Sequence, residues 1–171
     1  LVDQVQKMNN GVFCHEETAY EMHSDFCIGV AGYPEKHFEA PNLNSDLRFL
    51  KEKVDAGADY IVTQMFFDNS KYFEFVDKCR AMDINVPIIP GLKPLTVKRH
   101  INVLPSMFHI DIPDALSKEV EKCKDNKAVK QVGIEWAIQQ SKELMAANVP
   151  CLHYYTMSRS EATVAIAKEV F

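Results

Sequence analysis

The sequence predicts an α/β protein with a parallel sheet, and three observations carry that prediction. Short apolar runs rich in β-branched and aromatic residues recur along the chain, as expected of buried parallel strands. Segments with helical spacing fill the gaps between these runs. The first strands begin about 30 residues apart, which is the length of one βα unit. Repetition of that unit gives a sheet whose strands are joined by helices.

Each of the first two strands starts apolar and ends in polar or aromatic residues. The run Ile28-Gly-Val-Ala-Gly leads into Tyr33, and the run Tyr60-Ile-Val-Thr leads into Gln64. This change of character is typical of a buried parallel strand that opens into a functional loop. We expect four strands, at residues 26–33, 60–67, 86–91 and 151–156.

Apolar stripes and capping residues mark the helices between these strands. Leu47 and Leu50 share one helix face after the first strand, residues 42–45 offer capping side chains, and Gly57 suits the position just beyond the helix. A second apolar stripe runs through residues 72–81, before the third strand. Both helices therefore have one face to bury against the sheet.

The stretch before the last strand is much longer than the others. A short alternating run at residues 108–112 is ended by Pro113, so we interpret it as a loop rather than a fifth strand. Helical patterns in this stretch cover residues 98–103, 114–123 and 129–147. Extra helices are therefore expected before the last strand.

Composition excludes several classes of function. The chain has 171 residues, 47% of them hydrophobic, which is enough for the core of one globular domain. Its net charge of −5 comes from mixed acidic and basic residues, so no basic stripe is present to bind nucleic acid. No apolar stretch reaches the roughly 20 residues that cross a bilayer, and no export signal is visible, so we expect no membrane partner.

The cysteines indicate a reducing compartment. They are odd in number and widely spaced, and no CxxC pair occurs among them. This pattern argues against both a disulfide framework and a zinc site, so we expect no bound metal. Reduced thiols in the cytoplasm fit best. The five residues are Cys14, Cys27, Cys79, Cys123 and Cys151.

Two architectures suit such a chain, a doubly wound sheet and part of an eight-stranded barrel. No GxGxxG follows any strand, so the dinucleotide fingerprint of a doubly wound sheet is absent. The phosphate loop GxxxxGK[ST] is absent too. Polar residues instead cluster at the ends of several different strands, which is how barrel enzymes distribute their sites. We therefore predict a barrel.

Five motifs carry a resemblance to a known family. They are Ala31-Gly-Tyr-Pro-Glu-Lys-His37, Val54-Asp-Ala-Gly-Ala58, Thr63-Gln-Met-Phe-Phe-Asp68, Ile88-Ile-Pro-Gly91 and Tyr155-Thr-Met-Ser-Arg159. In this order and spacing the chain closely resembles methylenetetrahydrofolate reductase. Members of that family are (βα)8 TIM barrels, so the resemblance implies that residues 1–171 form a single domain, a partial barrel covering roughly strands five to eight.

The resemblance also implies a reaction. The family uses FAD to reduce 5,10-methylenetetrahydrofolate to 5-methyltetrahydrofolate with NADH or NADPH, a step of one-carbon folate metabolism that serves methionine biosynthesis. Its general-acid glutamate would precede Leu1, so no catalytic residue is assigned in this chain. Helical spacing from Leu1 to Met8 without an initiator methionine also suggests a truncated product. We expect the isolated chain to be inactive and, with half a barrel exposed, to form a homo-oligomer.

Three residues of the first loop are expected to contact FAD. Tyr33 could lie against the flavin, although a strand-end tyrosine is often an ordinary packing residue. His37 matches the family's FAD-contacting histidine; capping of its own loop and a metal pair with Glu35 are the alternatives. Ala40 would approach the cofactor through its backbone. Pro34 would make the turn between them rigid.

Asp46 and Lys53 lie seven positions apart on one face of the helix after the first strand. The resemblance places them at the ribose and phosphate region of FAD. A carboxylate there accepts from sugar hydroxyls, and a lysine gives a point charge to the phosphates. A solvated charged face is the alternative reading.

Gln64 and Arg159 are expected to bind the folate substrate. Gln64 is a polar amide in an apolar strand, and the resemblance places it against the pterin; an amide bonded to neighbouring backbone is the alternative. Arg159 would bind a carboxylate of the folate tail, unless it forms a surface salt bridge. No firm role is assigned to His100. Lys93 is expected to be solvated, with assistance to anionic ligand binding as the alternative.

Two other classes remain open from the sequence. A different barrel enzyme, such as an aldolase or a decarboxylase, would normally show a Schiff-base lysine or metal ligands at its strand ends, and none of the four strands clearly carries one. A non-catalytic barrel fragment that acts in assembly is the second alternative.

Overall fold

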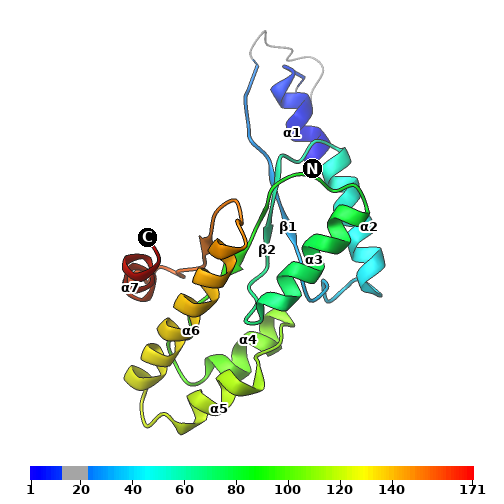
Figure 1. Cartoon of the computed structure of the whole chain (residues 1–171). Helices are drawn as coiled ribbons and strands as arrows, with labels where there is room; N and C mark the ends of the chain where they lie inside the picture. Colours follow the sequence, from blue (N-terminus) through cyan, green and yellow to red (C-terminus); the bar gives the residue numbers. More distant parts are fainter. Residues whose placement is uncertain (13–22) are drawn as a thin grey trace.

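The computed structural model describes residues 1–12 and 23–171, and Cys14 lies outside that part of the chain. Helices and strands alternate along it, as the apolar runs predict (Figure 1). No helix in the described ranges is long and apolar enough to cross a membrane. In chain order the elements are α1 (Val2–Asn9), β1 (Gly29–Gly32), α2 (Leu43–Asp55), β2 (Tyr60–Thr63), α3 (Asn69–Ala81), β3 (Ile88–Ile89), β4 (Gly91–Leu92), α4 (His100–Phe108), α5 (Asp114–Lys122), α6 (Asn126–Ala146), β5 (His153–Tyr154) and α7 (Glu161–Val170).

The strands pair in parallel, and neighbours in the sequence are neighbours in space. β1 pairs with β2, and β2 pairs with β3, where Ile61 lies opposite Ile88. β4 pairs with β5, where Gly91 lies opposite His153. Parallel strands in simple sequence order are what consecutive units of a (βα)8 barrel form. The predicted parallel α/β sheet is therefore confirmed.

Pro90 divides the third predicted strand into β3 and β4. Proline has no backbone N–H and cannot donate to a strand ladder. Its carbonyl still accepts a hydrogen bond from His153 N at 3.0 Å. The chain thus passes from the three-stranded sheet, where β3 pairs with β2, directly into the two-stranded sheet, where β4 pairs with β5.

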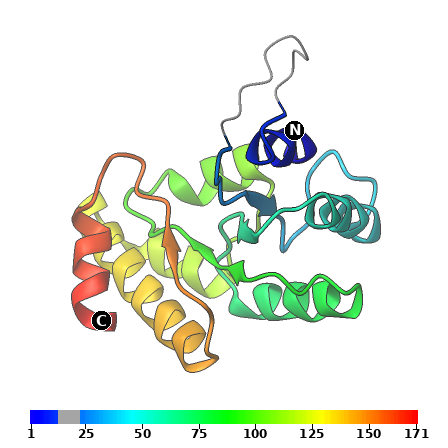
Figure 2. The same ribbon diagram turned by 90° about the horizontal axis from the view of Figure 1, so that it is seen from above.

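One face of the curved layer of strands is covered by helices α2, α3, α6 and α7 (Figure 2). Seen from above, cyan α2, green α3, orange α6 and red α7 follow one another around the strands (Figure 2). Strand residues that point toward the helices, such as Ile61 and Ile88, are buried, whereas Ala31 and His153 on the other face are exposed. The open face corresponds to the interior of a barrel of which this chain forms part.

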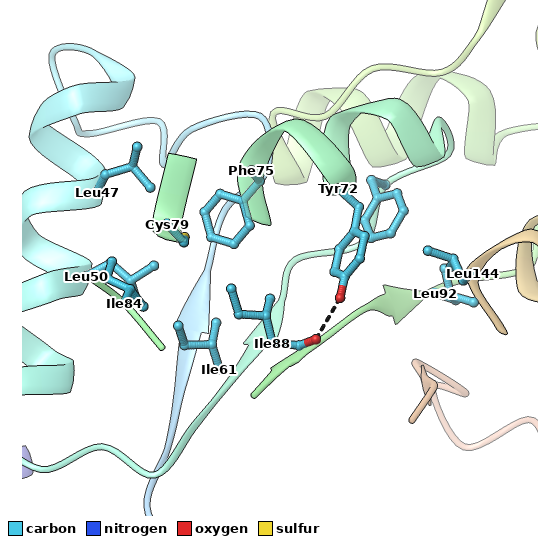
Figure 3. Packing of buried hydrophobic residues seen from close by; sticks show 11 residues of the cluster. Leu47, Leu50, Ile61, Tyr72, Phe75, Cys79, Ile84, Ile88, Leu92 and Leu144 are labelled. Carbon is cyan, nitrogen blue, oxygen red and sulfur yellow. Dashed lines mark hydrogen bonds between the residues drawn. The ribbon is translucent and has the colours of Figure 1, made fainter. Parts of the chain in front are cut away.

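The main core lies between the strands and helices α2 and α3. Leu47 of α2 and Phe75 of α3 pack around Ile61 in the cluster that Figure 3 shows. Within it, the hydroxyl of Tyr72 donates a hydrogen bond of 2.7 Å to the carbonyl of Ile88 (Figure 3). The buried phenol is thereby satisfied and ties α3 to the sheet.

Local chemistry sets the starts of these helices, as the sequence predicts for α2. The side chain of Asn42 accepts from Ser45 N at 2.9 Å and caps α2, and Gly57 follows that helix with a φ of 105°. Asp68 caps α3 by accepting from Ser70 N at 2.9 Å. Both helices therefore begin directly after the loops at the carboxyl ends of β1 and β2.

The long stretch before β5 forms α4, α5 and α6. Residues 109–113 connect α4 to α5 without a strand, as predicted. A second core cluster joins Met65 and Phe67 of the segment after β2 to Leu104 and Val129 of these helices. α4 and α5 lie at the opposite end of the strands from α1 (Figure 1). They therefore flank the carboxyl ends of the strands.

Candidate functional site

The loop after β1 brings three predicted residues together. The rings of Tyr33 and His37 meet edge-on with centroids 4.6 Å apart. Asp46 lies in the first turn of α2, and its Oδ2 accepts a hydrogen bond of 2.9 Å from His37 N. Burial, then the negative charges of Asp46 and Glu39, raises the pKa of Tyr33, so its hydroxyl stays protonated. Two aromatic rings and a carboxylate thus form one contact group.

The same loop is held by its own lysine. Lys36 has a φ of 78°, in the left-handed region, and its Nζ donates to the carbonyls of His37 at 3.0 Å and Ala40 at 2.7 Å. Ala40 is buried, and its N–H donates to His37 O. A ligand would meet at Ala40 only the second lone pair of a carbonyl already in use. The loop is therefore a preformed structure.

Lys53 lies apart from this contact group. It is about 10 Å farther along the axis of α2 than Asp46, since each helical residue rises about 1.5 Å. It lines a hollow beside Val30 and Ala31, along the outer edge of β1. Lys53 therefore does not contact the Tyr33 loop and faces the open side of the first strand.

Gln64 follows β2 directly and is half-buried. Its backbone N donates to Gly32 O at 2.8 Å, which fixes it beside the end of β1. Its side-chain Oε1 accepts from Met65 N at 2.9 Å. No residue of the described ranges accepts a hydrogen bond from its Nε2. The side-chain oxygen is therefore bonded to neighbouring backbone, while the amide nitrogen has no acceptor among the described residues.

Arg159 lies in a positively charged hollow at the ends of β4 and β5. The hollow has a volume of about 330 Å³ and is lined also by Lys93, Arg99 and His100. Arg159 itself is exposed, and its N–H donates to Thr156 O at 3.0 Å. Several cations around one concave surface favour an anionic ligand.

Lys93 is buried, which corrects the expectation of a solvated lysine. Its exposed fraction is 9%, and its Nζ donates to the carbonyl of Tyr155 at 3.1 Å. Burial lowers the pKa of this ammonium group. The expectation failed because the partner comes from β5, which joins β4 only in the folded chain.

His100 is held neutral by its surroundings. Burial, then the positive charges of Lys93, Arg99 and Arg159, lowers the pKa of its ring. Its Nδ1 accepts from Thr96 N at 3.3 Å, which leaves Nε2 as the protonated nitrogen. His100 therefore offers one neutral donor at the edge of the charged hollow.

The α4–α5 connection meets the β1 loop, a contact that sequence reasoning missed. Glu35 Oε2 accepts from Asp111 N at 3.0 Å, and the ring of Phe38 stacks on His109 with centroids 4.9 Å apart. Burial raises the pKa of Glu35 to about 7. These pairs join residues more than 70 positions apart, so no local pattern in the sequence could have found them.

The geometry does not favour a metal pair of Glu35 and His37. The carboxylate of Glu35 is turned to Asp111, whereas the ring of His37 packs against Tyr33. In the described residues no group of three or more His, Cys, Asp or Glu side chains could hold a metal ion.

The fold and the site define a class of protein, a partial parallel α/β barrel with polar and charged side chains at the carboxyl ends of its strands. The family model for methylenetetrahydrofolate reductase matches residues 14–170. The chain belongs to the methylenetetrahydrofolate reductase family. TIM-barrel architecture follows from that membership.

Individual relatives agree with the family. The methylenetetrahydrofolate reductase (NADH) 1 of Arabidopsis thaliana is 40% identical, over 82% of this chain and 26% of the plant protein. The 5,10-methylenetetrahydrofolate reductase of Salmonella typhimurium is 40% identical, over 84% of this chain and 49% of its own length. A probable methylenetetrahydrofolate reductase (NADPH) of Caenorhabditis elegans is 37% identical, over 85% of this chain and 22% of its own length. The chain thus spans half or less of the length of these relatives.

A solved structure shares the fold. It is an uncharacterized protein from Clostridium thermocellum that binds two copies of 5-methyl-5,6,7,8-tetrahydrofolic acid. It matches 85% of this chain and 52% of its own chain, with a TM-score of 0.55 and 20% sequence identity. This likeness supports the barrel-type arrangement of the strands and helices.

Proposed function

We propose that this chain holds FAD and the folate substrate at the carboxyl ends of its strands, within an enzyme that reduces 5,10-methylenetetrahydrofolate with NADH or NADPH. Family membership supports a role in the reduction of folates in one-carbon metabolism. Relatives named for NADH and for NADPH support a nicotinamide donor. The observation that carries the cofactor proposal is the contact group of Tyr33, His37 and Asp46.

The chemistry of this contact group fits FAD. The ring of Tyr33 offers an aromatic surface to the isoalloxazine, with His37 beside it. Asp46 has further carboxylate lone pairs for sugar hydroxyls, because only one of its oxygens serves His37 N. Lys53, at the open edge of β1, offers positive charge to the phosphates. When bound, FAD supplies the hydride chemistry between nicotinamide and folate.

Two neighbouring strand ends would hold the folate. The Nε2 of Gln64 would donate to an acceptor of the pterin, while its Oε1 is kept in place by Met65 N. The guanidinium of Arg159 would bind a tail carboxylate through two parallel hydrogen bonds. Lys93 and Arg99 would strengthen the attraction of that hollow for an anion. These residues bind and orient; the proposal assigns them no proton transfer.

A flavin titration of the purified chain tests the proposal. FAD is added to the chain while flavin fluorescence is followed, with Asp46→Ala as the variant. We expect saturable binding that the substitution weakens about tenfold, since a charged acceptor and the anchor of His37 are lost together.

Asp77→Ala provides the matched control. Asp77 is an exposed aspartate of α3, remote from the loop after β1, so this variant should bind FAD as the unaltered chain does. A folded chain that binds no FAD would refute the cofactor proposal. Equal affinities for the two variants would show that the flavin lies elsewhere.

A further inference from the structure

The α4–α5 connection is attached to the β1 loop by a directional contact. The carboxylate of Glu35 accepts the backbone N–H of Asp111 at 3.0 Å across 76 positions of sequence. Beside it the ring of Phe38 stacks on His109, at an interplanar angle of 24°. Two parts of the chain that have no contact in sequence are thus joined at the carboxyl ends of the strands.

The contact between Glu35 and Asp111 determines which part of the α4–α5 connection lies next to Gln64. Phe108, His109 and Ile110 line a small hollow of about 10 Å³ together with Tyr33 and Gln64. The connection therefore forms one wall of the space between the end of β1 and the end of β2. Its position decides how much room remains beside the predicted flavin and pterin contacts.

The connection has few other restraints on its direction. His109 ends α4 in the left-handed conformation, with φ 53° and ψ 47°, and both His109 and Asp111 are exposed. Ile110 is buried and supplies an apolar anchor, but apolar burial is not directional. The hydrogen bond to Glu35 is the directional contact that fixes the orientation of the backbone after α4.

We propose that Glu35 is a positioning residue, which holds the α4–α5 connection against the cofactor loop and so fixes the width of the site between Tyr33 and Gln64. The inference rests on the proposed FAD site. It assigns no chemical step to Glu35, whose Oε2 accepts from the backbone of the connection.

The proposal makes a specific demand on the side chain at this position. What holds the connection is an acceptor oxygen at the end of a three-carbon stem, and not the negative charge alone. Glu35→Gln keeps a carbonyl oxygen there and should preserve the contact, whereas Glu35→Ala removes the acceptor and leaves the N–H of Asp111 unpaired. Rescue by glutamine therefore separates positioning from electrostatic roles.

The experiment has two readouts on the same proteins. Hydrogen–deuterium exchange of residues 108–112 reports the contact itself, and the FAD titration reports its effect on the site. The proteins are the unaltered chain, Glu35→Ala, Glu35→Gln and the control Glu121→Ala, which removes an exposed glutamate of α5. A thermal melt of each variant establishes that it is folded before the comparison.

For Glu35→Ala we expect about tenfold faster exchange of residues 108–112 and about tenfold weaker FAD binding, the scale of one lost hydrogen bond to a charged group. Both Glu35→Gln and Glu121→Ala should match the unaltered chain in the exchange rate of residues 108–112 and in FAD affinity. Unchanged exchange in Glu35→Ala, or no rescue by Glu35→Gln, would overturn the inference. If the unaltered chain binds no FAD, the proposed function fails, while the exchange measurement still decides whether Glu35 holds the connection.

Discussion

Unused hydrogen-bond donors decide what single residues of this site can bind. Gln64 uses its side-chain oxygen locally and keeps its Nε2 donors, and Arg159 forms no ion pair within the described part of the chain. Both donors lie at carboxyl ends of strands, as in barrel enzymes generally. At the residue scale these donors and charges support the proposal of a ligand that is rich in acceptors and carries negative charge.

The guanidinium of Arg159 should strengthen folate binding more than a positive charge alone would. Its planar fork can form two hydrogen bonds with one carboxylate, whereas lysine offers only a point charge. We expect Arg159→Ala to weaken binding of 5-methyltetrahydrofolate about tenfold or more, and Arg159→Lys to recover only part of the loss. Isothermal titration calorimetry measures both. Full recovery by lysine would show that no bidentate contact forms.

Glu35 should make the stability of the chain depend on pH. Its folded-state pKa of about 7 lies above the ordinary value of 4.5, mainly because of burial. The folded chain therefore binds this proton more tightly than the unfolded chain, and the contribution to stability present below pH 4.5 is lost as the pH rises through about 7. As the pH rises from 4.5 through about 7, the free energy of unfolding of Glu35→Gln should therefore increase relative to that of the unaltered chain, because the neutral amide does not ionise.

Urea unfolding at pH 4.5 and at pH 8 measures this change. Glu121→Gln, at an exposed glutamate of α5, serves as the control and should follow the unaltered chain at both values. Parallel stability profiles for Glu35→Gln and the unaltered chain would mean that the carboxyl of Glu35 has an ordinary pKa.

At the scale of elements, Gly133 allows α6 to pack closely against the backbone of the segment after β4. A Cβ added to Gly133 would lie 1.9 Å from the carbonyl oxygen of Leu95, which is backbone and cannot turn aside. Leu95 follows Lys93 closely in the chain segment after β4. The close approach of α6 therefore fixes the backbone between Pro94 and Thr96, two residues that line the charged hollow.

Gly133→Ala tests that approach. Alanine normally stabilises a helix interior by about 1 kcal/mol relative to glycine. Here we expect the opposite sign, a loss of about 2 kcal/mol or more in the free energy of unfolding, because a backbone contact must open. Chemical denaturation measures it, with Lys142→Ala on the exposed face of α6 as a control expected to stay within about 0.5 kcal/mol. A stabilised Gly133→Ala would show that α6 packs less closely.

Elements set by local chemistry could be predicted from the sequence, and contacts between distant elements could not. Asn42 and Gly57 mark the ends of α2 because caps act within a few residues. The break at Pro90 has a local cause, the missing N–H, but the predicted strand of residues 86–91 ran through it. The burial of Lys93 depends on β5, and the contact of Glu35 depends on the α4–α5 connection, so neither has a signal within its own segment.

For the whole molecule, two strand edges and one sheet face stand open. Among the described residues β1 and β5 each have a strand partner on one side only. Unpaired edges and an exposed inner face are sites where further strands can add. The (βα)8 architecture of the family would close both edges with the remaining strands of the barrel.

The isolated chain should therefore associate with itself. We expect sedimentation equilibrium to show dimers or larger species as the concentration rises. Ala31→Lys places a charge on the exposed face of β1 and should shift the equilibrium toward the monomer. Ala146→Lys, on an exposed position of α6, is the matched control. A strict monomer at every concentration would show that the open edges are protected in another way.

The central claim is that the carboxyl ends of the strands form the FAD and folate site, and ligand mapping by NMR tests it most directly. Backbone amide shifts of the 19.5 kDa chain are recorded with FAD and with 5-methyltetrahydrofolate. The account predicts that FAD perturbs the loop of residues 33–40 and the start of α2, and that the folate perturbs Gln64 and residues 155–159. Perturbations confined to α1 and the amino ends of the strands, or to the outer faces of α6 and α7, would contradict it.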